Sequence, residues 1–239
     1  MALILNIDTS TSVCSVVLAR EGKVVAKKED STGQNHSLLL GTFIDTILKE
    51  NNLQAGDLDA VAVSMGPGSY TGLRIGVSMA KGLCYGASLP LIGVNTLQAL
   101  ALAATKLTNA ATDLHIAMPL LPRLYCPMID ARRMEVYTAV FDGDNQTVIE
   151  TKAEIITPDS FADTLNDNTV FFLGNGAEKA MTVIQSPNAR YISGVETSAE
   201  NMTEISEAHF AEKAFEDVAY FEPFYLKDFI ATTPKNKVL

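Results

Sequence analysis

Apolar runs separated by tight turns over the first thirty residues predict three consecutive strands. Residues 3–7 form a short apolar run that ends at Asp8, and residues 13–18 form a second run. Glu21-Gly22 then turns the chain into a third run, over residues 23–28. Short apolar runs joined by tight turns are typical of an antiparallel meander.

A helical period follows this meander. Apolar side chains recur every three or four positions over residues 37–49 and predict a helix: Leu39, Leu40, Phe43, Ile44, Ile47 and Leu48. Two further apolar runs, over residues 59–63 and 90–94, predict strands. Each of them precedes a predicted helix, over residues 70–84 and over residues 95–107, and the second helix starts at a capping asparagine.

The same order of elements then occurs again. The second half predicts strands over 125–130, 135–141 and 147–152, a helix over 159–165, a strand over 170–173 and a helix over 178–185. A βββαβα unit that occurs twice predicts an α/β fold of two similar lobes with a cleft between them. We assign residues 1–106 to the N-terminal lobe, 107–221 to the C-terminal lobe and 222–239 to a tail. Residues 110–123 connect the lobes, and residues 232–239 are expected to be poorly ordered unless docked.

The predicted helix over residues 70–84 follows a glycine-proline turn. It places Gly72, Gly76 and Ala80 on one stripe, because residues four apart share a face. Each of the two glycines costs about 1 kcal/mol relative to alanine, so some contact must offset them. The spacing allows three such contacts: packing on the chain's own sheet, close approach of a second helix, or an anion held by the turn and Arg74. Two apolar rows also favour two packing partners over one: Leu73 and Val77, then Ile75, Met79 and Leu83.

Charge and cysteine content narrow the function classes. The formal net charge is -10 and the pI about 4.7, and the densest basic pair is Arg132-Arg133, so strong direct binding of nucleic acid is disfavoured. The three widely spaced cysteines, without a CxxC motif, indicate reduced thiols in a cytoplasmic protein and no zinc site. No apolar run approaches the roughly 20 residues of a membrane span, and the N-terminus lacks the basic region of a signal peptide.

The segment AVAVSMGPGSYTGLRIGVSMAKGL is similar to the signature of the TsaB/YeaZ family. Other segments match in the family's order over nearly the whole chain: ILNIDTSTSVCSVVL, the helix after NHS, PLIGVNTLQALA, IDARRMEVYTAVF and PFYLKD. With an aspartate at the end of each first strand, the duplicated unit resembles the actin/Hsp70/sugar-kinase class. The resemblance therefore implies two actin-like, ribonuclease-H-like lobes.

The resemblance also implies a function in tRNA modification. Members of this family are non-catalytic dimerisation subunits without a cofactor. Each pairs with a larger TsaD-like paralogue. The paralogue transfers threonylcarbamoyl from its adenylate to the exocyclic amine of the adenine 3′ of the anticodon. A small TsaE-like P-loop ATPase completes the complex, tRNA is reached only through the complex, and a homodimer forms when the paralogue is absent.

The family's interface is a bundle of the first two helices of the N-terminal lobe, here residues 37–49 and 70–84. With the small stripe as the seam, the resemblance implies these interface residues: His36, Leu40, Phe43, Ile47, Tyr70, Gly72, Leu73, Arg74, Gly76, Val77 and Ala80. Three positions depart from the family pattern. Tyr70 replaces a common phenylalanine, Leu38 replaces a common glutamate, and Arg133-Met134 stands where a smaller residue is common.

No residue is assigned a catalytic role. Phosphate loops of this superfamily would contain Asp8, Ser10 and Thr11 at the first position and Asp130 at the second. Neither segment contains the glycine that lets backbone amides approach a phosphate, so we expect remnants of these loops. Gly174-Asn175-Gly176 is a possible remnant of a nucleoside-binding turn.

The superfamily also suggests two other functions. The catalytic paralogue binds a metal through two histidines four residues apart, and the matching positions here are His36 and Leu40, so a metallopeptidase fails on ligand count. His115 and His209 lie far away in sequence, without an acidic cluster of ligand spacing. A stand-alone ATP-binding phosphotransferase or ATPase of the actin-like superfamily stays as the alternative to a non-catalytic subunit.

Overall fold

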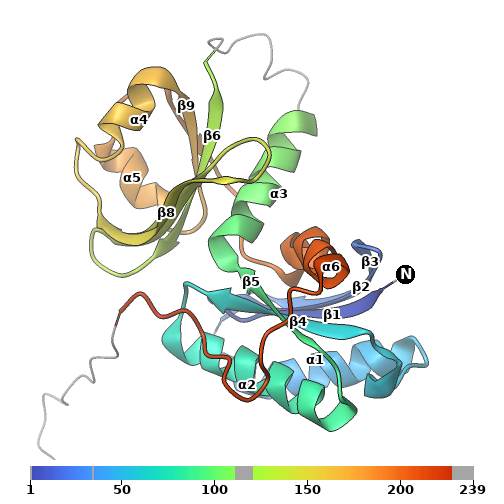
Figure 1. Cartoon of the computed structure of the whole chain (residues 1–239). Coiled ribbons are helices and arrows are strands. Elements are labelled where there is room, and N and C mark those ends of the chain that lie inside the picture. Colours follow the sequence, from blue (N-terminus) through green and yellow to red (C-terminus); the bar gives the residue numbers. More distant parts are fainter. Residues whose placement is uncertain (1, 34, 111–120, 228–239) are drawn as a thin grey trace, which may run out of the picture.

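The computed structural model describes residues 2–33, 35–110 and 121–227. Figure 1 shows two lobes, each built on one sheet, with a long helix between them. The expectation for residues 232–239 and most of the predicted connection over residues 110–123 lie outside the described residues. None of the helices in the described ranges has both the length and the hydropathy that a bilayer span requires.

The first lobe begins with the predicted meander and continues with strand–helix units. Its elements are β1 (Leu3–Asp8), β2 (Cys14–Arg20), β3 (Lys23–Asp30), α1 (His36–Glu50), η1 (Ala55–Asp57), β4 (Ala60–Gly66), α2 (Tyr70–Ala87), β5 (Leu91–Asn95) and α3 (Thr96–Ala110). The sheet has the order β3-β2-β1-β4-β5. Strand β2 is antiparallel to its neighbours β1 and β3, whereas β1, β4 and β5 run parallel.

The second lobe has the same topology. Its elements are β6 (Arg123–Asp130), β7 (Glu135–Phe141), β8 (Thr147–Ile155), α4 (Ala162–Asp167), β9 (Thr169–Leu173), α5 (Ala177–Val183) and β10 (Ala189–Ile192). The order β10-β9-β6-β7-β8, read from β8, is that of the first sheet. The prediction of two similar α/β lobes is therefore confirmed.

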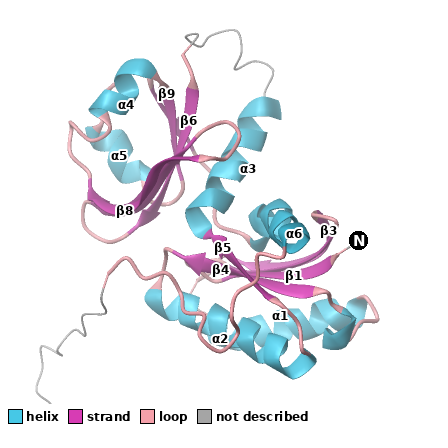
Figure 2. Cartoon of the chain, in the orientation of Figure 1, coloured by secondary structure: helices cyan, strands magenta, loops and turns pink. Residues whose placement is uncertain are grey.

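Side chains of β1 divide between two core layers because successive residues of a strand point to opposite faces. Leu3, Leu5 and Ile7 pack with α1 and α2, which cover one face of the first sheet. Ile4 instead joins the layer under η3 (Ala199–Met202) and α6 (Thr203–Glu212). Figure 2 shows α1 and α2 on one side of this sheet and α6 on the other.

Two helices do not follow the predicted division into lobes. Helix α6 comes from residues assigned to the second lobe, yet it packs on the first sheet, where Ser206 Oγ donates to Asn6 Oδ1 over 2.7 Å. Helix α3 presents Leu97 and Leu100 to the second sheet, so the division after residue 106 falls inside an element that contacts both lobes. The sequence pattern did not predict β10 or α6.

Candidate docking face and interlobe cleft

Gly72 and Gly76 face the end of the chain's own first strand, and Ala80 is buried in the core layer between the first sheet and the helices α1 and α2. A Cβ atom added at Gly72 would lie 2.1 Å from Thr9 O, and one added at Gly76 would lie 2.3 Å from Thr9 Oγ1. The Thr9 hydroxyl also donates to Gly72 O over 2.7 Å. The two glycines are therefore small because the end of β1 lies against α2, and Ala80 is buried inside the same lobe. This corrects the assignment of the three residues as the seam with another helix. Of the three contacts that the spacing allowed for this stripe, the structure shows the packing of α2 on the chain's own sheet.

Other residues of the predicted interface also belong to the interior of the lobe. Five more of them are buried in the chain itself: His36, Leu40, Ile47, Leu73 and Val77. The His36 ring contacts Thr11 O through Nε2 over 2.9 Å. Only Phe43, Tyr70 and Arg74 keep exposed surface, and Arg74 is the most open of these three. The predicted set thus lies on α1 and α2, but mostly on the sides that face into the lobe.

The outward side of α2 carries a second stripe of small residues. Ser78, Gly82 and Gly86 lie four residues apart and are exposed, in line with Tyr70 and Arg74. Within the described part of the chain, a Cβ atom added at Gly82 or Gly86 would meet nothing within 4 Å. No contact with a described residue therefore offsets the cost of about 1 kcal/mol that each of these two helical glycines carries.

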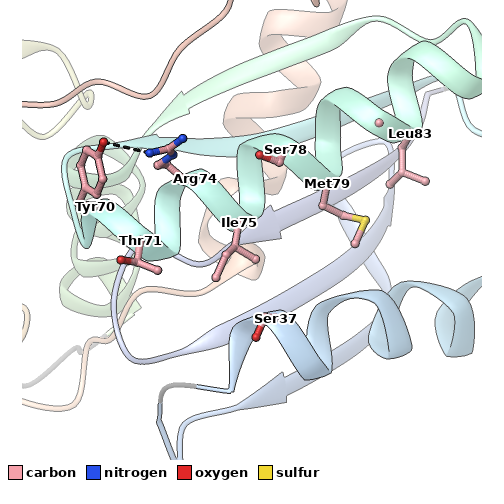
Figure 3. A pocket seen from close by; sticks show the side chains of 9 residues that line it. Ser37, Tyr70, Thr71, Arg74, Ile75, Ser78, Met79 and Leu83 are labelled. Carbon is pink, nitrogen blue, oxygen red and sulfur yellow. Dashed lines mark hydrogen bonds between the residues drawn. The ribbon is translucent and has the colours of Figure 1, made fainter.

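This stripe borders an open groove between α1 and α2, which we call the α1/α2 groove. Its volume is about 740 Å³, and its lining residues are Ser37, Tyr70, Thr71, Arg74, Ile75, Ser78, Met79, Gly82 and Leu83. In Figure 3, Ile75 and Met79 point toward α1, while Arg74 Nη1 donates to Tyr70 Oη over 3.1 Å. The predicted second apolar row of α2 therefore forms this groove, and its spacing was the sequence signal that could have located it.

The first phosphate-loop position is occupied by intrachain contacts. Asp8 is buried and accepts hydrogen bonds from the Ser10 amide and hydroxyl, at 2.8 and 2.6 Å. Burial raises the pKa of Asp8 above its usual value, although the bonds from Ser10 oppose this rise. Ser10 O in turn accepts from the Ser69 amide over 2.6 Å, and a Cβ atom at Gly68 would lie 2.3 Å from Ser10 O. The loop thus presents carbonyl oxygen to α2, which suits packing and not a phosphate.

The second phosphate-loop position is also paired within the chain. Partial burial alone would raise the pKa of Asp130, but hydrogen bonds from Lys179 Nζ and the Arg132 amide, each 2.6 Å, hold this pKa below its usual value. The glycine turn nearby serves the strand end: a Cβ atom at Gly174 would lie 2.5 Å from Met128 O, and the Gly176 amide donates to the same oxygen. The residues at this position do not fit a nucleotide phosphate.

The metal pair of the catalytic paralogue does not fit this chain either. Leu40 is buried among apolar side chains, and the Nε2 atom of His36 is taken by Thr11 O. Among the described residues, no three His, Cys, Asp or Glu side chains are grouped closely enough to hold an ion.

Between the lobes lies a polar cleft of about 900 Å³. Its walls include Ser10 and Thr11 from the first lobe, and Asp130 with the Arg132-Arg133 turn from the second lobe. Residues 224–227 also line it. Because Tyr70, Thr71 and Ile75 line both this cleft and the α1/α2 groove, the N-terminal end of α2 joins the two sites.

The duplicated lobes and the helix pair on the first sheet define a two-lobed α/β protein. The family model described as TsaD, tRNA N6-adenosine threonylcarbamoyltransferase, matches residues 23–238. TsaB of Escherichia coli is 32% identical over 95% of this chain and 96% of that protein. TsaB of Bacillus subtilis is 31% identical over 94% and 93%. This chain belongs to the TsaB/YeaZ family, within the group that the TsaD model describes.

A solved structure agrees with this fold. YeaZ from Pseudomonas aeruginosa superposes with a TM-score of 0.78 and covers 95% of this chain and 100% of that protein, at 24% identity. At this level of identity the superposition is evidence for the two-lobed fold alone.

Proposed function

We propose that this chain is a non-catalytic subunit in the formation of threonylcarbamoyladenosine in tRNA, and that it docks on a partner through the α1/α2 groove. Its full-length relatives are named tRNA threonylcarbamoyladenosine biosynthesis proteins. The observation that carries the docking role is the pair of exposed helical glycines Gly82 and Gly86, of which Gly82 lines the open apolar groove. An added Cβ at either glycine would meet none of the described residues within 4 Å. Small residues at such a position allow the backbone of another helix to come close.

The expected partner has the same fold. The family model that matches this chain is that of a transferase, TsaD, so a TsaD-like paralogue can present an equivalent helix pair and complete a helical bundle. A second copy of this chain can occupy the same groove when the paralogue is absent. A TsaE-like P-loop ATPase completes the complex in the cytoplasm.

Transfer chemistry and tRNA binding belong to the complex in this proposal. Asp8 and Asp130 are held by Ser10 and Lys179, and Leu40 replaces a metal ligand, which supports a subunit without its own catalytic site. A net charge of -10 disfavours binding of tRNA by the chain alone. A gel-shift assay at moderate salt should therefore show no complex of this chain with tRNA unless the paralogue is present.

The docking role is tested by Gly82→Trp, which fills the groove without touching the core. The matched control is Gly143→Trp, because Gly143 is also exposed with nothing within 4 Å of an added Cβ, but lies in the β7–β8 turn of the other lobe. Sedimentation of the chain alone and with a TsaD-like paralogue should show lost association for Gly82→Trp only. Association of Gly82→Trp with wild-type affinity for both partners would refute the assignment of the groove.

The alternative, an ATP-using phosphotransferase or ATPase, makes a different prediction. Calorimetry of the purified chain with ATP and Mg²⁺ should give no binding tighter than high micromolar if both phosphate-loop positions are remnants. A tighter ATP complex, together with hydrolysis by the chain alone, would replace the proposed role by the alternative.

A further inference from the structure

The segment after α6 returns along the first lobe and is fixed there by several contacts. The Glu216 amide donates to Leu91 O over 2.9 Å, which adds a single antiparallel bridge to the edge of β5. Lys81 Nζ on α2 donates to Ala219 O and Phe221 O, at 3.1 and 3.0 Å. Phe221 is buried in the core layer under α1 and α2. The segment therefore reaches the cleft in a fixed position.

Residues 222–227, which we call the clasp, then run along the N-terminal end of α2. The Phe224 amide donates to Met65 O over 2.7 Å. The Phe224 carbonyl lies so close to Gly66 that a Cβ atom there would be only 2.8 Å from it, and Gly66 has a φ of +113°. The Tyr225 ring packs on the Tyr70 ring, with centroids 4.7 Å apart and planes tilted by 35°. The clasp is thus held by the backbone of one strand end and by one aromatic side chain.

The last described residue of the clasp reaches the second lobe. Lys227 Nζ forms an ion pair with Glu135 at the start of β7 and lies 5.8 Å from the centroid of the Tyr137 ring. Residues 224–227 line the interlobe cleft on the way. The clasp therefore closes one side of the cleft and joins the two lobes there.

Tyr70 connects the clasp to the α1/α2 groove. Its ring supports Tyr225 on the cleft side, and its hydroxyl accepts from Arg74 on the groove side. The Arg74 guanidinium carbon lies 5.5 Å from the centroid of the same ring. Arg74 is exposed on the outer face of α2, so a protein seated in the groove covers Arg74 and limits the motion of the Tyr70 ring.

We propose that docking in the α1/α2 groove and closure of the clasp stabilise each other through Tyr70. The inference rests on the proposed docking function and adds to it a coupling between the groove and the cleft. A docked partner fixes the Tyr70 ring, so Tyr225 loses less freedom when it packs there, and the clasp stays closed. Since coupling between two binding equilibria is reciprocal, a chain whose clasp cannot close must bind the partner less tightly.

The test removes the Tyr225 ring and leaves the groove intact. Tyr225→Ala deletes the aromatic contact, Tyr225→Phe keeps it, and Tyr220→Ala removes a ring that is 83% exposed in the same segment. The partner probes are a second copy of the chain and a TsaD-like paralogue, with affinities from sedimentation. Hydrogen exchange of residues 222–227, above all of the Phe224 amide, reports closure of the clasp.

Tyr225→Ala should weaken docking measurably, by at most about tenfold, because the coupling cannot exceed what one aromatic pair contributes. It should also accelerate exchange of the Phe224 amide, and docking should no longer slow that exchange. Tyr225→Phe and Tyr220→Ala should behave as the wild type in both measurements. Unchanged affinity of Tyr225→Ala, or wild-type docking that leaves exchange of the clasp unaltered, would overturn the coupling alone. Failure of the wild type to dock on either probe would overturn the proposed function as well.

Discussion

Two identical substitutions on α2 should change stability in opposite directions. Gly76→Ala places a methyl group against the end of β1, and Gly82→Ala places one in open space on the same helix. Both variants gain helix propensity of at most about 1 kcal/mol. The contacts around each position therefore decide the sign of the change in unfolding free energy.

The cost at Gly76 follows from the contact with Thr9. The added Cβ would lie 2.3 Å from Thr9 Oγ1, whereas ordinary contact begins at 3.4 Å, about 1 Å further away. The hydroxyl cannot turn aside freely because it donates to the buried Gly72 carbonyl. Losing that hydrogen bond, or shifting the helix, costs about 1–3 kcal/mol. We therefore expect Gly76→Ala to destabilise the protein by up to about 2 kcal/mol after the gain in propensity.

Gly82→Ala should stabilise the monomer by about 0.5–1 kcal/mol, because nothing opposes the gain. For a chain of this length, 1 kcal/mol corresponds to a shift of roughly 2–4 °C in Tm. Circular dichroism melts of both variants and the wild type, at two protein concentrations, separate this effect from any effect on association. A Tm for Gly76→Ala at or above that of the wild type would refute the packing of the small stripe on the chain's own strand.

Three further predictions concern titratable groups. Folding raises the pKa of Asp8, so the contribution of Asp8 to stability is present below the ordinary aspartate pKa and is lost as pH rises through the raised pKa. Asp8→Asn should remove this loss of stability with rising pH, as measured by urea melts between pH 3 and pH 7. Lys179→Met should raise the pKa of Asp130 in an NMR titration and cost at most about 1 kcal/mol at neutral pH, since that carboxylate is partly exposed. Native protein should resist alkylation by iodoacetamide at pH 8. Burial raises the thiol pKa to about 11 for Cys14 and Cys84 and to about 12 for Cys126. Rapid alkylation of any of the three thiols in the folded protein would contradict their burial. A stability difference between Asp8→Asn and wild type that does not change with pH would contradict the pKa shift of Asp8.

The sequence by itself determined the kind and order of most elements. The apolar runs and the helical periods predicted both meanders and the helices α1 to α5, because local spacing controls which side of an element is apolar. Asn95 was also recognisable as a cap, and its side chain accepts from the Leu97 and Gln98 amides. The strands ending at Asp8 and Asp130 marked the start of each lobe.

Only the tertiary structure decided what lies against each face. The helical period predicts that Gly72 and Gly76 share a side of α2. The two atoms that keep them small, a carbonyl oxygen and a hydroxyl oxygen, both belong to Thr9, more than sixty residues earlier. The exposed pair Gly82 and Gly86 has the same spacing, so spacing alone cannot tell an inward stripe from an outward one. Likewise α6 lies on the first sheet although its residues follow the second lobe, because the apolar face left open there is covered by whichever segment can reach it. The spacing of residues in the sequence determines the side of a helix or strand on which a side chain lies. Which residues pack against that side depends on the tertiary fold.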